Sequence, residues 1–458
     1  MRNLIIAAAV TAISLVGPPA QAQPAPDAHA RALAAGYKAS FLCSNLFNAG
    51  MTPEQVAQDD LEGIYAEYQK LVRELPADID RQARRVSVAF DEQLPPRIAA
   101  WRPDLGCTQL PVGAEAGLAA QLPKLSVSRP AGLSDARPWP DGEAGIRPRP
   151  SAPLKAAVAK AFDGAGYGAG TKTTAVVVVK DGRIVAEQYR PDFTPHTSQR
   201  TWSVAKSLAA TVVGRAVQLG HVRVEAPADI PEWPAGDPRR AITLAQLMHM
   251  GSGLWTDGPG NRTDEVYVGG ALVTETATAM PLEAAPGVRF RYANNDTLLA
   301  ARAVRAALGD GQAALDLPFA ELLWKIGMSR TTPETDWRGS YILSSQVWTT
   351  ARDLARLGLL YQNDGVWNGE RLLPEGWVRF VTTPAPAQPP AGPGYGAFFW
   401  LYGEAQGLPA GTYAMNGNRG QYVFIVPEKR VVIVRRGFDP AGKRFDEAAF
   451  ARDILAAL

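Results

Sequence analysis

The residues best placed to do chemistry in this sequence are a serine and a lysine three positions apart, Ser203 and Lys206. In a helix this spacing puts both side chains on one face, one turn apart, so the amine can take the hydroxyl proton without a histidine. Tyr292 and Asn294 follow about ninety residues later and add a second acid/base group and an amide. A serine acyl-enzyme is the simplest chemistry that uses all four groups.

The helix that should carry this pair is rich in small and apolar residues as far as Gly220, so we expect Lys206 to be buried. Burial and nearby cations lower the pKa of an ammonium group, which would make Lys206 a usable base near neutral pH. Ser203 would begin the helix, where the positive end of the helix dipole favours a developing oxyanion.

The Tyr-x-Asn pattern occurs twice, and the two copies have different surroundings. Tyr361-Gln362-Asn363 ends a predicted helix that begins at Thr350, and it runs into the turn Asp364-Gly365, which favours a structural role. Tyr292-Ala293-Asn294 stands on a loop just before a predicted helix over 297–307, capped by Asn295 or Asp296. A tyrosine on such a loop can project into a cleft, so Tyr292 is the candidate.

A third element is needed to bind the oxyanion, and the glycine-rich stretch before a late strand can supply it. Gly420 would let the backbone approach a ligand closely. The main-chain N–H groups of Gln421 and Ser203 would then bind the negative charge, with Asn418 and Arg419 beside them.

Together these elements resemble the serine β-lactamase and penicillin-binding superfamily. The likeness is greater to its class C-related branch, which includes esterases, D-aminopeptidases and 6-aminohexanoate-dimer hydrolase. It covers about residues 150–458, and further stretches support it: 247–254, 350–357, 365–374, 394–396 and Trp400.

The resemblance implies roles for the candidate residues and requires neither metal nor organic cofactor. Ser203 would be the nucleophile, Lys206 the base or proton relay, and Tyr292 the acid/base that serves the leaving group, while Asn294 orients Lys206 or the substrate. Either Lys206 or Tyr292 could be the resting base. β-Lactamases commonly carry Lys-Thr-Gly at the third motif, where this chain has Asn418-Arg419-Gly420. Arg419 could supply a charge there, but the difference favours an amide or ester over a β-lactam.

The strand pattern predicts an α/β (α+β) domain over 153–458, and the resemblance implies that its fold is β-lactamase/transpeptidase-like. Expected strands come early and late, with a helical subdomain between them, which indicates one antiparallel sheet built from both ends of the domain. The expected strands are 173–179, 183–189, 411–416, 421–426 and 430–435, and a last helix covers 447–458.

The residues before this domain divide into three parts. Residues 1–22 have the pattern of a cleaved signal peptide. Residues 23–110 are predicted to be an extra helical unit, with helices over 53–75 and 78–92, and residues 111–152 a connector rich in Pro and Gly. Cys43 and Cys107 would form one structural disulfide or stay as two thiols, and neither has a nearby histidine that would make it catalytic.

Composition excludes several classes of function. A net charge of +2 over 458 residues, without Lys/Arg runs, does not indicate nucleic acid binding. The apolar stretch near the N-terminus is too short to be a stable membrane anchor. The four histidines lack metal-ligand spacing, and a Gly-x-Ser-x-Gly elbow is absent from the sequence.

The sequence therefore predicts a periplasmic or secreted serine hydrolase that cleaves a small amide or ester through a Ser203 acyl-enzyme. Two alternatives stay open: a β-lactamase or D-amino-acid peptidase acting on cell-wall substrates, and a non-catalytic penicillin-binding sensor on the same fold. The oligomeric state is not indicated by the sequence.

Overall fold

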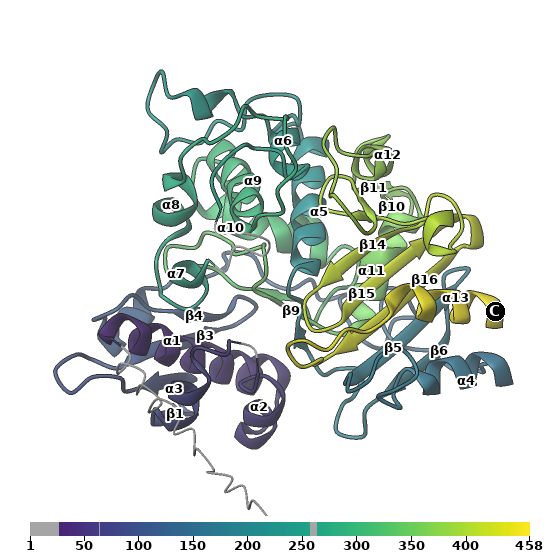
Figure 1. The fold of residues 1–458 in the computed structure, drawn as a ribbon, viewed down its shortest axis with the longest axis horizontal. Helices are drawn as coiled ribbons and strands as arrows, with labels where there is room; N and C mark the ends of the chain where they lie inside the picture. Colours follow the sequence, from purple (N-terminus) through teal and green to yellow (C-terminus); the bar gives the residue numbers. More distant parts are fainter. Residues whose placement is uncertain (1–26, 64, 257–262) are drawn as a thin grey trace, which may run out of the picture.

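A seven-stranded antiparallel sheet forms the centre of the larger part of the molecule (Figure 1). The structure, a computed structural model, describes residues 27–63, 65–256 and 263–458. The strand order is β12-β13-β14-β15-β16-β5-β6, so strands from early and late in the domain meet at the β16–β5 pair. This confirms the predicted fold class and the five predicted strands. The bounds are β5 Thr173–Lys180, β6 Arg183–Tyr189, β12 Gly394–Tyr395, β13 Trp400–Leu401, β14 Tyr413–Gly417, β15 Gln421–Val426 and β16 Val431–Gly437.

Both faces of this sheet are buried, which explains its continuous β-branched runs. Val176 and Val178 face a layer formed by α4 (Ala152–Lys160) and α13 (Glu447–Ala457). Val177 and Val179 belong to the larger core on the opposite face, where α11 (Ala351–Gln362) packs against β15, β16 and β5. The alternation of side chains along a strand assigns successive valines to different cores.

Most helices and short strands between β6 and β12 form the helical subdomain, whose helices α6, α8 and α9 lie in the upper part of Figure 1, whereas α11 packs on the large sheet. The central helix of the subdomain is α5, which packs against α9 and against β14 and so links the subdomain to the sheet. The bounds are α5 Val204–Gln218, α6 Leu244–Met248, α7 Asp264–Tyr267, α8 Val273–Thr276, α9 Asn294–Ala307, α10 Gln312–Pro318, α12 Trp377–Thr382, β7 Gln199–Arg200, β8 Thr332–Pro333, β9 Val347–Thr349, β10 Val366–Trp367 and β11 Glu370–Arg371.

The N-terminal unit is not purely helical, which corrects the prediction for residues 23–110. Helices pack on a four-stranded antiparallel sheet in the order β1-β2-β3-β4. Where a helix over 78–92 was expected, β1 and β2 form a hairpin, because Val86 and Val88 are buried at every second position. The bounds are α1 Ala28–Ser44, α2 Pro53–Asp59, α3 Gln69–Glu74, β1 Ala77–Asp80, β2 Arg85–Val88, β3 Arg97–Arg102 and β4 Gly106–Gln109.

The helix predicted over 53–75 is also interrupted. It begins as expected at the capping box of Thr52, but α2 ends at Asp59 and α3 begins ten residues later, at Gln69. Gly63 lies between them with φ +69°, a left-handed conformation that stops a helix. Asp59 and Asp60 accept hydrogen bonds from Arg190 and Arg419 of the larger domain, so the chain leaves the helix where it meets that domain.

Buried contacts join the N-terminal unit to the larger domain. The predicted disulfide is confirmed, and it ties Cys43 in α1 to Cys107 in β4. Glu334 of the larger domain accepts hydrogen bonds at 2.7 Å from Ser44 Oγ and at 2.9 Å from Cys107 N. The pair of Arg419 and Asp60 is almost fully buried, with N–O separation 2.8 Å. One apolar core runs through both parts.

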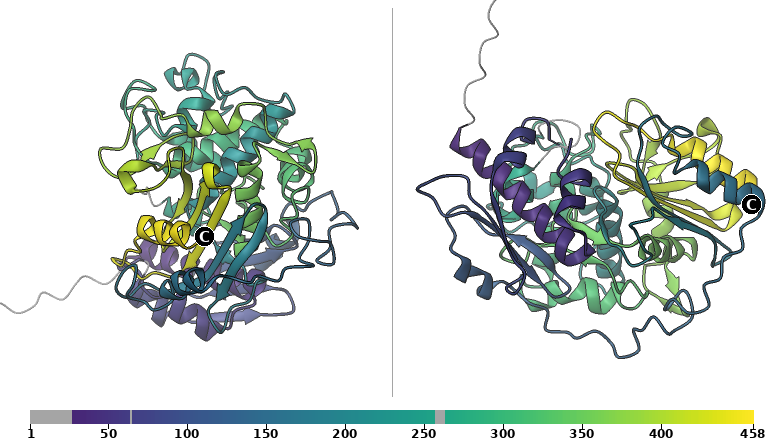
Figure 2. Two further views of the ribbon diagram at one scale, coloured as in Figure 1. Left: turned by 90° about the vertical axis from the view of Figure 1, so that its right-hand side faces the viewer. Right: turned by 90° about the horizontal axis from the view of Figure 1, so that it is seen from below.

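The segment 111–152 runs along the outside of the molecule from the N-terminal unit to α4 (Figure 2). It is fixed at several points, among them Trp139 Nε1, which donates to the carbonyl of Gly182, and Gly142, whose carbonyl accepts from Arg356. The predicted signal sequence, residues 1–22, lies outside the described residues. Within the described ranges, helices that combine the length and hydropathy needed to cross a bilayer are absent.

Candidate active site

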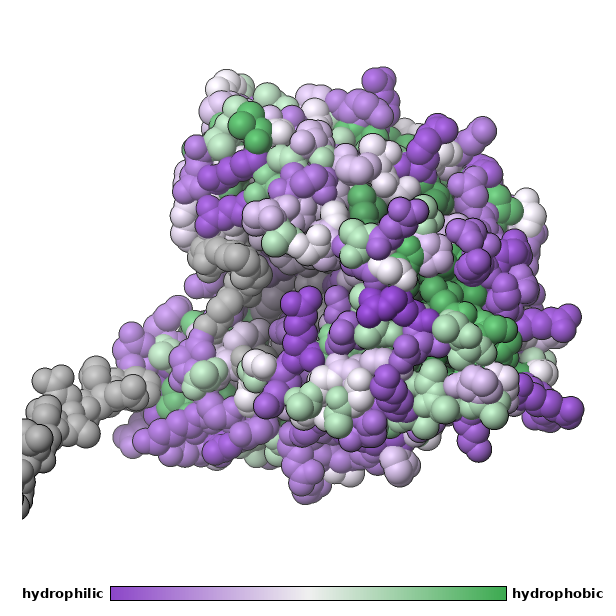
Figure 3. Space-filling view, turned by 45° about the vertical axis from the view of Figure 1, so that its right-hand side comes forward, coloured by the Kyte–Doolittle hydropathy of each residue, from purple (hydrophilic) through white to green (hydrophobic). Residues whose placement is uncertain are grey.

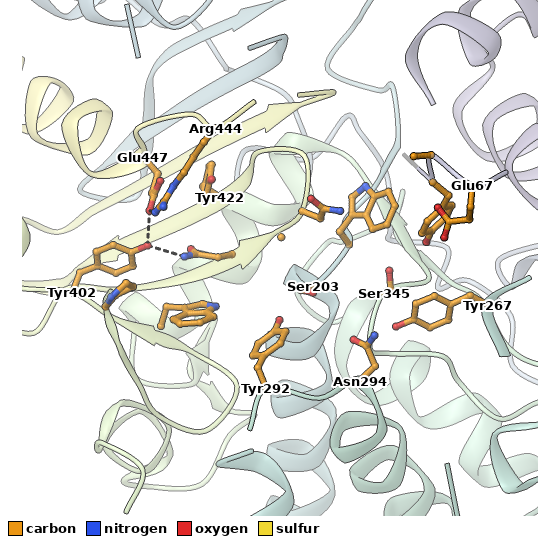
Figure 4. Close-up of a pocket in the computed structure, with 18 residues that line it drawn as sticks. Glu67, Ser203, Tyr267, Tyr292, Asn294, Ser345, Tyr402, Tyr422, Arg444 and Glu447 are labelled. Atoms are coloured by element: carbon orange, nitrogen blue, oxygen red, sulfur yellow. Dashed lines mark hydrogen bonds and ion pairs between the residues drawn. The ribbon is translucent and has the colours of Figure 1, made fainter. Parts of the chain in front are cut away.

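A cavity of about 720 Å³ opens where the N-terminal unit, α5 and the edge of the large sheet meet. Figure 3 shows the surface hollowed between the N-terminal unit and the helices above it. Figure 4 shows Ser203 near the middle of the cavity, with Glu67 toward one end and Arg444 and Glu447 toward the other. The lining includes four of the predicted residues from distant parts of the chain: Ser203, Tyr292, Asn294 and Asn418.

Ser203 stands at the start of α5, and its local backbone is held in an unusual conformation. Trp202, directly before it, has φ 50°, a left-handed angle that costs a bulky residue about 1–3 kcal/mol. Contacts on both sides hold this residue: its ring lies 6.3 Å from that of Phe41 in α1, and the guanidinium of Arg200 lies 3.9 Å from its centroid. The N-terminal unit therefore supports the turn that presents Ser203.

Lys206 lies one helical turn after Ser203 and is 1% exposed. Its Nζ donates to Ser203 Oγ at 3.2 Å, to Asn294 Oδ1 at 2.6 Å and to the Ser344 carbonyl at 2.9 Å. All three acceptors are neutral oxygens, so they hold the amine in place without stabilising its charge as a carboxylate would. Burial, and then the positive charge of Arg200, lowers the pKa of Lys206 to about 7.

Tyr292 contacts both Ser203 and Lys206. Its side chain hydrogen-bonds with that of Ser203, and its ring centroid lies 5.0 Å from Lys206 Nζ. The ring stacks on Trp400, with 5.6 Å between centroids. Burial raises the pKa of Tyr292 above its usual value. At neutral pH this residue is thus a phenol that can donate a proton, whereas the lowered pKa of Lys206 makes its neutral amine accessible.

Asn294 lies in the cavity, and the second Tyr-x-Asn copy lies outside it, as the sequence predicts. Asn294 begins α9, one turn earlier than predicted, with Ala293 as the cap residue in place of Asn295 or Asp296. Tyr361 is buried in α11, where its hydroxyl lies 3.0 Å from Thr211 Oγ1, and it is absent from the cavity lining.

The strand segment nearest to Ser203 lies a few residues earlier in the sequence than the predicted third motif. Gly417 ends β14, and a Cβ built on it would lie 2.4 Å from the Thr201 carbonyl and 3.2 Å from Ser203 N. A side chain cannot fit there, so the strand backbone lies against the start of α5. The cavity is lined by Asn416, Gly417 and Asn418.

Arg419, Gly420 and Gln421 have structural roles instead, which corrects the prediction for this motif. Arg419 forms the buried pair with Asp60 and so turns away from the cavity. A Cβ on Gly420 would collide with Arg435 Nη1, so the glycine accommodates a buried guanidinium and not a ligand. Gln421 opens β15 opposite Gly417, and its amide donates to the carbonyls of Arg419 and Gly437.

Several residues that line the cavity were not predicted from the sequence. Tyr65, Ala66 and Glu67 come from the N-terminal unit, outside the stretch that carried the resemblance. Their sequence has no motif that could have marked them, because their place depends on how the two parts dock. At the opposite end the missed residues are Tyr402, Tyr422, Arg444 and Glu447.

The chain is similar in sequence and in fold to several known hydrolases. A curated relative, 6-aminohexanoate-dimer hydrolase from Paenarthrobacter ureafaciens, is 26% identical over 296 residues, which is 58% of this chain and 72% of the relative. A proposed 6-aminohexanoate-dimer hydrolase from Bacillus anthracis has a similar structure, with TM-score 0.52 and 23% identity over 62% of this chain and 78% of that one. A family VIII carboxylesterase matches with TM-score 0.54 and 17% identity over 68% and 99%.

The family model named Beta-lactamase matches residues 158–456, well over half of the sequence. That match covers Ser203, Lys206, Tyr292 and Asn294 and excludes the N-terminal unit. The chain therefore belongs to the β-lactamase family, and it is a serine hydrolase of that superfamily.

Proposed function

We propose that the protein is an exported serine hydrolase that cleaves a small amide or ester through an acyl-enzyme on Ser203. The observation that carries this proposal is that Ser203 and Tyr292 line one cavity, while the buried Lys206 reaches Ser203 from behind the wall, with Lys206 Nζ 3.2 Å from Ser203 Oγ. Both the relative from Paenarthrobacter ureafaciens and the carboxylesterase fold neighbour support a carbonyl substrate that is not a β-lactam.

In the proposed acylation step, neutral Lys206 takes the proton of Ser203 as Oγ attacks the substrate carbonyl. Its lowered pKa, and the neutral oxygens that accept its hydrogen bonds within the described residues, favour Lys206 over Tyr292 as the resting base. The phenol of Tyr292 then gives its proton to the leaving nitrogen or oxygen and regains one from Lys206, which leaves the acyl group on Ser203. Water, deprotonated by the same groups, releases the acid and restores the serine.

The negative charge of the tetrahedral intermediate requires main-chain donors. We assign this role to the N–H of Ser203 and to one in the Gly417–Asn418 stretch, which the missing side chain of Gly417 brings close to the nucleophile. Such a donor is worth about a hundredfold to a thousandfold in rate. Asn294 accepts a hydrogen bond from Lys206 at 2.6 Å and so fixes the direction of the amine.

The third motif favours amides and esters over β-lactams. A lysine for the substrate carboxylate is absent from the Asn416-Gly417-Asn418 stretch. Asn416 Nδ2 donates instead to Tyr402 Oη at 2.7 Å. We propose export because the Cys43–Cys107 disulfide suits an oxidising compartment and the first 22 residues have the signal pattern.

Covalent labelling tests the nucleophile. Ser203→Ala should lose all labelling by a fluorophosphonate probe, whereas Ser345→Ala should keep it, although Ser345 lines the same cavity. Labelling that persists in Ser203→Ala would contradict the assignment.

A hydrolysis panel tests the reaction class. Repeated turnover of p-nitrophenyl esters or linear amides is expected, with nitrocefin a poor substrate. One stoichiometric burst without turnover would favour the sensor alternative, and release of D-alanine from peptidoglycan fragments would favour the cell-wall peptidase.

A further inference from the structure

The catalytic cavity does not stop at the residues that surround Ser203. A second hollow of about 590 Å³ adjoins it, and the two share four lining residues: Pro393, Tyr402, Arg444 and Glu447. Beyond this boundary the second hollow extends over the Gly166–Gly168 loop and the first turn of α13. The two spaces are therefore parts of one groove that leads away from Ser203.

Hydrogen bonds connect the catalytic end of this groove to the boundary. Asn416 Nδ2 donates to Tyr402 Oη at 2.7 Å, and that hydroxyl donates to Glu447 Oε1 at 3.3 Å (Figure 4). Tyr402 and Glu447 are 6% and 8% exposed, so both are held firmly in the wall. Side chains that are already ordered before a ligand binds lose little conformational entropy on binding. These buried polar groups can therefore form a binding surface.

The composition of the second hollow is polar and carries charges of both signs. Arg444 is largely exposed and lies 3.8 Å from the Glu447 carboxylate, and Asp446 and Gln406 complete the polar lining. Glycine backbone forms much of the remainder, at Gly166, Gly168 and Gly392. Such a surface offers both donors and acceptors, which matches the alternating N–H and C=O groups of an extended amide chain.

We propose that the second hollow is a subsite for a further unit of a linear oligoamide, so that the enzyme acts on chains longer than the two units flanking the scissile bond. This inference rests on the proposed amidase function and adds the length of its substrate. The main cavity, at about 720 Å³, lies within the usual size range of about 300–1,000 Å³ for a whole small-molecule site. The second hollow is thus additional space, which a dimer would leave empty.

Rates on a length series test the proposal in the wild-type protein. The probes are linear dimers, trimers and tetramers of 6-aminohexanoate, all with free ends. A unit bound in the second hollow stabilises the transition state through contacts remote from the reaction, so kcat/KM should rise about tenfold from dimer to the longer chains. Equal kcat/KM values for all lengths would overturn the proposal.

Two variants on one helix locate the effect. Ala448 lies half-buried in the first turn of α13 and lines the second hollow but not the main cavity. Ala448→Phe should fill that hollow and abolish the preference for longer chains, while activity on the dimer stays within about twofold. Ala456→Phe is the matched control, since Ala456 is exposed near the other end of α13 and is absent from both linings.

The outcomes separate this proposal from the proposed function. If all oligoamides and esters fail to react and Ser203 is not labelled, the hydrolase assignment fails first. If Ser203 is labelled and dimers are turned over, but Ala448→Phe lowers the rates on dimer and tetramer by the same factor, the subsite is refuted. Thermal melting of both variants checks that the fold is retained, and the wild-type series decides the question if Ala448→Phe does not fold.

Discussion

The N-terminal unit and the β-lactamase domain face the same cavity, but they contribute different things to it. Every group placed to react, namely Ser203, Lys206 and Tyr292, comes from the domain that the family model matches. The N-terminal unit, outside that match, contributes Tyr65, Ala66 and Glu67 as wall. We therefore assign the proposed chemistry to the domain that the family model matches, whereas the shape of the cavity depends partly on the N-terminal unit.

The added unit is bound as firmly as a part of the core. Removing one partner of a buried pair such as Arg419 and Asp60 typically costs about 3–5 kcal/mol, because a charge is left without compensation. Phe41 also packs against Trp202, the residue before the nucleophile. Two groups of residues can therefore be tested separately. Substitutions in the reacting set, Ser203, Lys206 and Tyr292, should abolish or greatly slow hydrolysis. Substitutions in the wall, Tyr65, Ala66 and Glu67, should alter which substrates are accepted.

The largest expected effect comes from the reacting set. Lys206→Ala and Tyr292→Phe should each slow acylation by about 10²–10⁴-fold, because each removes a proton-transfer group. Burst kinetics with a p-nitrophenyl ester measure this rate. Tyr361→Phe is the control for Tyr292→Phe: it removes the hydroxyl of the other Tyr-x-Asn copy, which faces Thr211, and should leave the rate within about twofold. An unchanged rate in Lys206→Ala or Tyr292→Phe would remove that residue from the mechanism.

The pH dependence of acylation should follow Lys206. The amine acts as a base only when neutral and its pKa is about 7, so kcat/KM should fall about tenfold per pH unit below that value and level off above it. Tyr292 stays protonated throughout this range, since burial raises its pKa.

A second buried group titrates in the same range and provides a control. Burial raises the pKa of Asp296 to about 7, against the hydrogen bonds from Ser252 that lower it. Asp296→Asn keeps an oxygen for Ser252 but cannot titrate. If this variant loses the pH dependence while the wild type shows it, Asp296 and not Lys206 controls the profile.

Local pattern was enough to predict the sheet and to select Ser203, Lys206 and Tyr292, which the fold brings together. Strands such as β5 and β15 carry their own runs of β-branched residues, and the Ser203–Lys206 spacing depends only on one helix. Tyr292 could be preferred over Tyr361 because a loop before a helix and a helix end have different local signatures. These inferences needed no knowledge of distant contacts.

The parts that sequence reasoning missed are those that distant contacts decide. The sequence predicts Arg419 beside the substrate, but Arg419 forms a buried ion pair with Asp60, more than three hundred residues earlier in the chain. The sequence predicts correctly that Gly420 has no room for a side chain. The group packed against it, however, is Arg435 and not a ligand. The residues of β1 and β2 are predicted to be helical because a short apolar run is compatible with both the helical period of 3.6 residues and the strand period of 2.

The smallest and most selective effect is expected from the wall that the N-terminal unit supplies. Ala66 is exposed to the cavity, and Ala66→Trp should narrow it without touching Ser203, Lys206 or Tyr292. Activity on the small substrate p-nitrophenyl acetate should stay within about twofold, whereas kcat/KM for linear oligoamides should fall about tenfold, because only bulky substrates reach this wall.

The matched control for this wall is Ala83→Trp. Ala83 is an exposed alanine of the same unit, in the turn between β1 and β2, and it is absent from the cavity lining. This variant should leave the ratio of the two activities unchanged. If Ala66→Trp lowers both activities equally, the N-terminal unit affects the reacting set itself, because a change confined to the wall must spare a substrate that does not reach it. An unchanged ratio with full activity on oligoamides would mean that substrates bind without contacting the unit, and its role would then be to hold Trp202 and the turn before Ser203.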